Sequence, residues 1–295
     1  MSFRFQNRRS CLTAILAASI LFLGQSLGQD SNGSRAEAKA PVRKASGGTR
    51  SSGTGQVYPQ FKFGGQKVVR WIPEQMPLHV YISHGLCLDE LGVDPNTGGP
   101  LSNIDNTSGW PDLVGKAVSD PETFKQMKVA EHYNEQMWQA ALQGVSQWKR
   151  FGGDGLYNFE ITNDPSEADI FVFWTHHFVN KLGLALFAND IRGYTAKFML
   201  PYGPVMSALQ QGQTDRIQFK PVVVVLRTSD TTGVPMPLGK LVAASAHEMG
   251  HVLGIDGHSA NPHDLMSVYY GNGTVSPNDA ATVRYLYKLQ PDLLP

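Results

Sequence analysis

Cysteine is almost absent from this sequence of 295 residues, which contains only Cys11 and Cys87. Cys11 lies in an N-terminal segment that we expect to be removed, so the mature chain would keep one thiol and form no internal disulfide. The remaining Cys87 follows a strand-like segment inside the predicted domain. A small buried side chain is the commoner role of a cysteine in that setting.

The sequence also lacks an excess of charge of either sign. Lysine plus arginine equals aspartate plus glutamate, at 25 each, and charged residues make up only 17% of the chain. No overall basic field is present to attract nucleic acid, so we expect no nucleic-acid partner.

Long apolar runs are missing beyond the N-terminus. The run 11–24 follows three arginines and precedes small residues, which is the layout of a secretory signal. Residues 1–28 are therefore predicted to be a signal peptide, and the protein to be secreted, extracellular or periplasmic, with no stable membrane span after cleavage. An uncleaved anchor is the alternative interpretation.

The remaining chain divides into a linker and one main domain. Residues 29–56 are rich in Ser, Gly, Ala, Lys and Arg and have almost no apolar side chains, which predicts a disordered linker. Residues 57–295 contain enough apolar residues to bury one substantial core.

Several segments of this domain have clear secondary-structure patterns. The apolar patterns predict strands at 78–82, 156–162, 169–175 and 222–226, and the nearly all-apolar 169–174 is typical of a strand covered on both faces. Helices are predicted from Asp120 to about 152, around 241–253, and from Ser276 to 287. The expected fold class is therefore α/β (α+β).

Residues 85–119 are predicted to form a long loop, rich in Gly, Asn, Asp and Pro. Within it, the spacing from Asp94 to Asp105 loosely resembles a calcium-binding loop. The pattern has Gly where a side-chain ligand is expected, and turn formation explains the same residues without Ca²⁺.

Three histidines outside the main motif need interpretation. His132 falls on the helix predicted from Asp120 and has no partner at metal-ligand spacing, so we interpret it as structural. His176 and His177 at a strand end could bind a second, structural metal. No acidic residue lies near them in sequence, which favours ordinary loop histidines.

The sequence H-E-x-x-H at 247–251 is the strongest chemical signal in the chain. On a helix this spacing places His247 and His251 one turn apart on the same face, where both can bind one Zn²⁺. Glu248 would lie beside the metal's open position and act as general base toward water. Gly254 can end the helix with a sharp turn that returns a third ligand, for which His258 is well placed.

On these residues the chain resembles a metzincin zinc metalloprotease, most similar to the secreted bacterial relatives of the matrixins. Three features carry the resemblance. They are the helix predicted around 241–253 that carries His247 and His251 (the zinc helix), the sequence Asp264-Leu265-Met266-Ser267, which resembles the Met-turn, and the closing helix from Ser276. The resemblance implies a twisted, mostly parallel sheet with an antiparallel edge strand, two long helices, a Met-turn and a C-terminal helix. It also implies a zinc-dependent endopeptidase that acts on a protein or peptide substrate.

One position departs from the family pattern. The family sequence H-E-x-x-H-x-x-G-x-x-H would place the third histidine at Gly257. His258 is favoured as the ligand because imidazole is a frequent zinc ligand and the glycines supply the turn. Asp256 is the alternative and could instead orient a ligand, and His263 lies farther along. A gluzincin is excluded because no glutamate follows Glu248.

The resemblance also suggests roles for residues around the metal. Met266 would form an apolar floor beneath the ligands. Tyr269 or Tyr270 could donate a hydrogen bond to the oxyanion, although packing explains them equally well. Cys87 could block the metal as a latency switch, a role that its position inside the domain disfavours.

Two other functions are compatible with the same residues. The altered third-ligand spacing and the insert 85–119 would also suit a secreted, non-catalytic binding or assembly module that holds zinc structurally. The same catalytic groups could instead hydrolyse an amide in a cell-wall polymer. Sequence alone does not separate these hypotheses, because the cleft loops determine specificity.

Overall fold

The computed structural model describes residues 55–93, 98–120, 122–180, 184, 191–230 and 232–295. The predicted signal peptide and nearly all of the predicted linker lie outside this part of the chain. Within it, no helix has both the length and the apolar character needed to cross a membrane.

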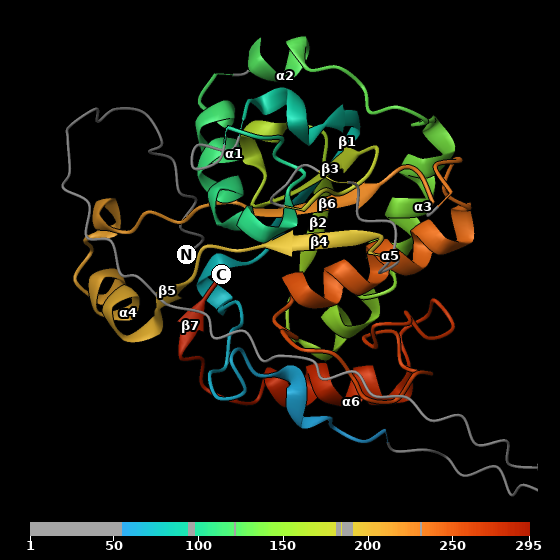
Figure 1. Ribbon diagram of the computed structural model, residues 1–295. Coiled ribbons are helices and arrows are strands. Elements are labelled where there is room, and N and C mark those ends of the chain that lie inside the picture. Colours follow the sequence, from blue (N-terminus) through green and yellow to red (C-terminus); the bar gives the residue numbers. More distant parts are fainter. Residues whose placement is uncertain (1–54, 94–97, 121, 181–183, 185–190, 231) are drawn as a thin grey trace, which may run out of the picture. The chain divides into compact units, whose positions relative to one another are not determined.

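A five-stranded sheet lies at the centre of the fold (Figure 1), with the strand order β2-β1-β3-β6-β4. The strands are β1 Leu78–Cys87, β2 Phe159–Thr162, β3 Ile170–Thr175, β4 Gly193–Ala196 and β6 Val222–Arg227. The four strands β2, β1, β3 and β6 pair in parallel, and β4 pairs with β6 in the antiparallel direction at the edge. The predicted mostly parallel sheet with one antiparallel edge strand is confirmed.

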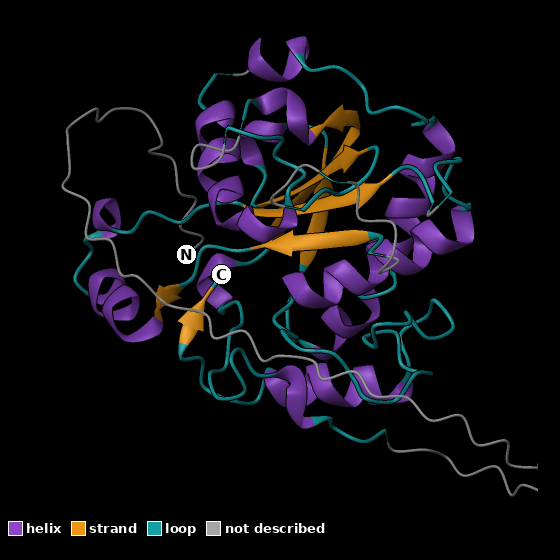
Figure 2. Cartoon of the chain, in the orientation of Figure 1, coloured by secondary structure: helices purple, strands orange, loops and turns teal. Residues whose placement is uncertain are grey.

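Helices cover both faces of the sheet (Figure 2). The longer helices α3 Glu135–Ser146 and α5 Leu238–Val252 share one apolar cluster with alternate residues of β3 and β6. The helices α1 Trp110–Val118 and α2 Glu122–Gln126 contribute to a second cluster with the other residues of those strands. Every residue of β3 and β6 is therefore buried, as their apolar sequences predict.

The two longer helices pack unusually close together. A Cβ built on Gly144 in α3 would lie 1.9 Å from the Oγ of Ser245 in α5. Next to this crossing, the Nε1 of Trp148 donates a hydrogen bond to the carbonyl of Ala246 at 2.7 Å. The small residues 243–246 therefore permit the close helix contact that the sequence predicts.

The C-terminal helix α6 Pro277–Leu286 begins as predicted. Ser276 caps it, because its Oγ accepts a hydrogen bond from the backbone N–H of Asp279 at 3.1 Å. The buried Asp279 carboxylate in turn accepts from the backbone N–H of Leu265 at 2.9 Å and from the hydroxyl of Tyr58 at 3.2 Å. One carboxylate thus joins α6, the segment after α5 and the start of the domain.

The remaining elements are short. A two-stranded sheet pairs β5 Leu200–Pro201 with β7 Leu293–Leu294, next to α4 Tyr202–Gln210. The 3₁₀ helices are Pro59–Phe61, Pro73–Gln75, Leu88–Leu91, Ile104–Gly109, Lys149–Asp154, Pro165–Glu167 and Thr214–Arg216.

The prediction of a long loop over 85–119 was wrong. This region contains the end of β1, two 3₁₀ helices and α1. The helix α1 has only nine residues, and Trp110 and Val114 are the largest apolar side chains that it buries. A stripe this short carries little periodic signal among the surrounding Gly, Asn and Asp residues.

The prediction of one helix from Asp120 to about 152 was also wrong. Helix α2 ends at Gln126, and α3 begins only after Asn134, whose side chain caps it. The apolar period continues across the break by coincidence, because Met127 packs in the cluster on one face of the sheet and Met137 in the cluster on the other. His132 therefore lies in the break and not on a helix.

Candidate metal centre

Helix α5 carries the H-E-x-x-H sequence in its last turns and stops as predicted. Gly254 has a φ of 109°, and a Cβ at this position would lie 2.1 Å from the carbonyl oxygen of Val69. A residue with a side chain would therefore suffer both backbone strain and a clash at the point where the chain turns back.

Hydrogen bonds to backbone carbonyls hold the imidazole rings of His247 and His251 so that their Nε2 atoms face each other. The Nδ1 of His247 lies 2.8 Å from the carbonyl of Leu265, and the Nδ1 of His251 lies 2.6 Å from the carbonyl of Ile255. Because a carbonyl oxygen only accepts, each Nδ1 must carry the proton, which leaves the lone pair of each Nε2 unprotonated. These two Nε2 atoms are 3.1 Å apart, a repulsive arrangement that a cation between them would relieve.

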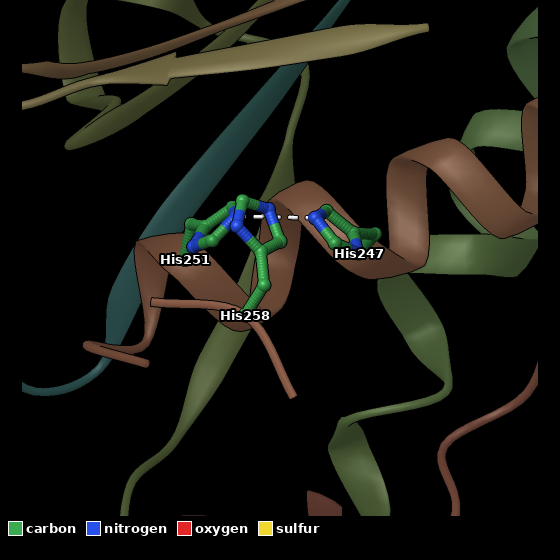
Figure 3. A group of neighbouring side chains, drawn as sticks. All are labelled: His247, His251 and His258. Atoms are coloured by element: carbon green, nitrogen blue, oxygen red, sulfur yellow. Dashed lines mark hydrogen bonds between the residues drawn. The ribbon is translucent and has the colours of Figure 1, made fainter. Parts of the chain in front are cut away.

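His258 completes a group of three. Its ring centroid lies 5.1 Å from those of His247 and His251, and one ligand nitrogen from each histidine lies within 4.8 Å of the others. In Figure 3 the first two rings project from one face of α5 and His258 reaches them from the returning chain. Two ligands of one tetrahedral zinc would be about 3.3 Å apart, so little rearrangement is needed.

Burial favours the neutral, ligand form of these imidazoles. Desolvation lowers the pKa of His247 to about 4, against the smaller raising effect of its hydrogen bond to Leu265. Desolvation likewise lowers the pKa of His251 well below its ordinary value, and that of the more exposed His258 to a lesser degree. The donor set therefore fits a borderline-soft divalent cation such as Zn²⁺.

The other candidates for the third ligand lie elsewhere. The carboxylate of Asp256 faces the buried Nζ of Lys197, with 3.8 Å between them. The same Nζ donates to the carbonyl of His251 at 3.1 Å, so Lys197 connects Asp256 to the end of the zinc helix. His263 is exposed and is not part of the three-histidine group.

Met266 lies beneath the zinc helix and is fully buried. A Cβ on Gly250 in α5 would lie 2.3 Å from the Met266 sulfur, so the thioether packs directly against the helix backbone. The preceding residue, Leu265, supplies the carbonyl that orients His247. The segment expected as the Met-turn thus contacts the zinc helix at two consecutive residues.

The two tyrosines after this turn differ in their surroundings. Tyr269 is 72% exposed. Tyr270 is buried, its ring centroid lies 4.6 Å from that of His247, and its hydroxyl accepts a hydrogen bond from the backbone N–H of Arg192 at 3.2 Å. Tyr270 is therefore the tyrosine in contact with the histidine group, where it packs against a ligand ring.

Glu248 points from α5 toward the edge strand β4. Its Oε2 accepts a hydrogen bond from the Oγ1 of Thr195 at 2.7 Å. A Cβ on Gly193, two residues earlier on β4, would lie 2.6 Å from the Cγ of Glu248. Neither contact can be predicted from the sequence, because Gly193–Ala196 is a four-residue strand inside a weakly patterned connection.

The carboxyl group of Glu248 is buried, and this changes its proton affinity. Desolvation raises the pKa of Glu248 to about 7, while the hydrogen bond from Thr195 and the charge of Lys197 act in the opposite direction. A carboxylate in this range can both accept and release a proton near neutral pH.

Two other sequence predictions concern residues away from this centre. Cys87 ends β1 and is not part of the histidine group, and burial raises the pKa of its thiol to about 11. A protonated thiol is a poor zinc ligand at neutral pH. The possible calcium loop begins at residues 94–97, which lie outside the described residues, so calcium remains an untested prediction.

Comparison with known proteins agrees with this geometry over part of the chain. The family model described as Matrixin matches residues 231–288, a range that contains all three histidines, Glu248 and Met266. No curated protein matches the chain.

Proposed function

We propose that this chain is a matrixin-like metzincin and a secreted zinc-dependent endopeptidase. In this proposal His247, His251 and His258 hold zinc, and Glu248 is the general base. One observation carries the proposal. Two imidazoles fixed by backbone carbonyls turn unprotonated nitrogens toward each other at 3.1 Å, and a third imidazole lies beside them.

When bound, zinc would supply the Lewis acidity that lowers the pKa of water to about 7, so that water can give up a proton at neutral pH and attack a carbonyl. Glu248 accepts the proton that the attacking water loses and returns it to the leaving amine. Thr195 holds one carboxylate oxygen in place by its 2.7 Å hydrogen bond. Burial excludes bulk water from the carboxyl group, which keeps its pKa close to the pH at which it must exchange protons.

The position of β4 supports an extended peptide as substrate. It is an edge strand of the five-stranded sheet, and its Thr195 touches Glu248. An extended chain can add to a sheet edge through backbone hydrogen bonds. A peptide bound along β4 would therefore pass close to the general base.

The proposed location rests on the N-terminal sequence. The arginines, the apolar run and the small residues of 1–28 support a cleaved secretory signal. N-terminal sequencing of the protein recovered from the medium or the periplasm of an expressing cell should begin near residue 29. A protein retained in the cytoplasm with residue 1 intact would contradict this part of the proposal.

The substitution Glu248→Gln tests the catalytic role. The amide keeps the shape of the side chain but cannot take a proton, so casein cleavage should fall by about 100-fold or more while zinc content is unchanged. Cleavage at the wild-type rate by the zinc-loaded variant would show that Glu248 is not the base.

The wild-type protein distinguishes the two alternative functions. Stoichiometric zinc without cleavage of a diverse peptide library would favour a non-catalytic binding module. Release of products from a cell-wall polymer, with peptides left intact, would favour an amide hydrolase.

A further inference from the structure

A second group of metal-ligand side chains lies apart from the three histidines. Glu131, His132 and His176 place one ligand atom each within 4.8 Å of one another. The first two come from the break between α2 and α3, and His176 directly follows β3. The sequence raised a second metal at His176 and His177 but offered no acidic ligand near them, because only folding brings Glu131 to His176.

The backbone fixes the position of Glu131 and His132. The backbone N–H of Tyr133 donates to the carbonyl of Ala130 at 3.1 Å, which closes a turn with these two residues at its centre. The backbone N–H of Ala130 donates to the carbonyl of Gly85 in β1, and the hydroxyl of Thr228 donates to the carbonyl of Glu131. The turn is therefore attached to the sheet on both sides.

His132 adopts a backbone conformation that costs energy. Its φ is 65°, in the left-handed region that few non-glycine residues adopt, although histidine, asparagine and aspartate are found there more often than the others. Such strain persists where the surrounding structure enforces it, and it often marks a binding site. Here it brings the imidazole of His132 to within 5.1 Å of the His176 ring, measured between centroids.

His176 presents a nitrogen without a hydrogen-bond partner. Its backbone carbonyl accepts from the backbone N–H of Ser229 at 3.3 Å, so the main chain is held between the ends of β3 and β6. Its Nδ1 is buried, makes no hydrogen bond among the described residues and lies 3.9 Å from the Oε2 of Glu131. A buried polar atom of this kind is normally satisfied by a donor, water or an ion.

We propose that Glu131, His132 and His176 form a second metal site, for a zinc-like divalent transition ion, that fastens the turn before α3 to the end of β3. Two imidazoles and one carboxylate suit this class of ion, with water completing the coordination. The Glu131 side chain is 68% exposed and can rotate, so its oxygens can move the short distance needed to coordinate. The proposal shares no ligand with the centre on α5 and does not depend on its activity.

Zinc stoichiometry of the full-length protein tests the proposal. The protein is stripped with a chelator, loaded with Zn²⁺, freed of excess and analysed for zinc per chain. We expect two zinc ions in the native chain and one in both His132→Asn and His176→Gln. Asparagine tolerates positive φ better than most residues, so His132→Asn removes the imidazole without requiring a new backbone.

Two further variants separate this site from the first. His84→Asn removes an exposed imidazole elsewhere and should keep two zinc ions. His247→Ala combined with His251→Ala should keep one zinc ion, which adding His132→Asn then removes. If His132→Asn and His176→Gln bind as much zinc as the native chain, the proposal is wrong, whatever the fate of the centre on α5.

Crystallography provides an independent check. Anomalous scattering at the zinc edge from crystals grown with Zn²⁺ should give a peak between the Nδ1 of His176 and the side chains of Glu131 and His132. Absence of that peak in crystals where the α5 centre is fully loaded would overturn the proposal.

Discussion

The hydroxyl of Thr195 donates a hydrogen bond of 2.7 Å to the carboxylate of Glu248, and this contact joins the edge strand of the sheet to the zinc helix. The same hydroxyl lies 3.3 Å from the backbone carbonyl of Glu248. The proposed general base is therefore positioned by a strand that lies more than fifty residues earlier in the chain.

Replacing Thr195 by valine should shift the pH profile of cleavage to higher pH. The base must be deprotonated to act, so activity is present above its pKa and is lost as pH falls through it. Burial raises the pKa of Glu248 to about 7 and the Thr195 hydrogen bond lowers it, so loss of the hydroxyl raises it further. The measurement is kcat/KM against pH, with Thr195→Ser, which keeps the hydroxyl, as the control. An acid limb that moves to lower pH in the valine variant would contradict this role.

A methyl group at Gly193 should disturb the same carboxylate. The Cβ of Gly193→Ala would lie 2.6 Å from the Cγ of Glu248, which forces the side chain or the strand to move. A displacement of about 1 Å at a catalytic group can cost 100-fold in rate, so kcat should fall by roughly that factor while zinc is retained. Gly203→Ala is the matched control, since its Cβ would meet no atom within 4 Å. Equal activity in both variants would show that Glu248 does not need this space.

The assignment of the third ligand leads to different results for two neighbouring substitutions. His258→Ala removes a proposed ligand and should weaken zinc binding by more than about 100-fold, the upper range seen for outer-shell partners. Asp256→Asn removes only the partner of Lys197 and should weaken it by less. Zinc affinity is measured by competition with a chelator of known strength. The opposite order would make Asp256 the ligand.

Trp148→Phe should destabilise the fold without altering the chemistry. The substitution removes the hydrogen bond of 2.7 Å to the carbonyl of Ala246 but keeps most of the ring that fills the space between α3 and α5. The net loss is about 1 kcal/mol, which corresponds to a decrease of about 2–4 °C in the melting temperature of a domain of this size. Calorimetry measures the change, and kcat for the folded variant should stay at the native value.

The sequence predicted the parts of the fold that local chemistry determines. Apolar runs identified β3 and β6 because strands buried on both faces are apolar over most of their length, with Thr175 and Arg227 as the polar residues at their ends. Ser276 and Asp279 identified α6 because a capping box places both residues at fixed spacing. His247 and His251 were predicted to share a face because four residues make about one helical turn.

The remaining features depend on contacts between distant segments. The apolar period from Met127 to Met137 continues across the break at His132, but the two methionines pack in the clusters on opposite faces of the sheet. Thr195 and Lys197 lie near Glu248 because β4 crosses the zinc helix, which no local spacing indicates. Glu131 likewise approaches His176 only because folding brings the turn before α3 to the end of β3.

The dependence of proteolysis on zinc tests the central claim most directly. The native protein is stripped of metal with a chelator, assayed for casein cleavage, reloaded with one to two equivalents of Zn²⁺ and assayed again. The three-histidine centre predicts that cleavage disappears with the metal and returns with it in the native chain, but not in His247→Ala. Cleavage that persists in the zinc-free protein, or that never appears in the zinc-loaded one, would contradict the account.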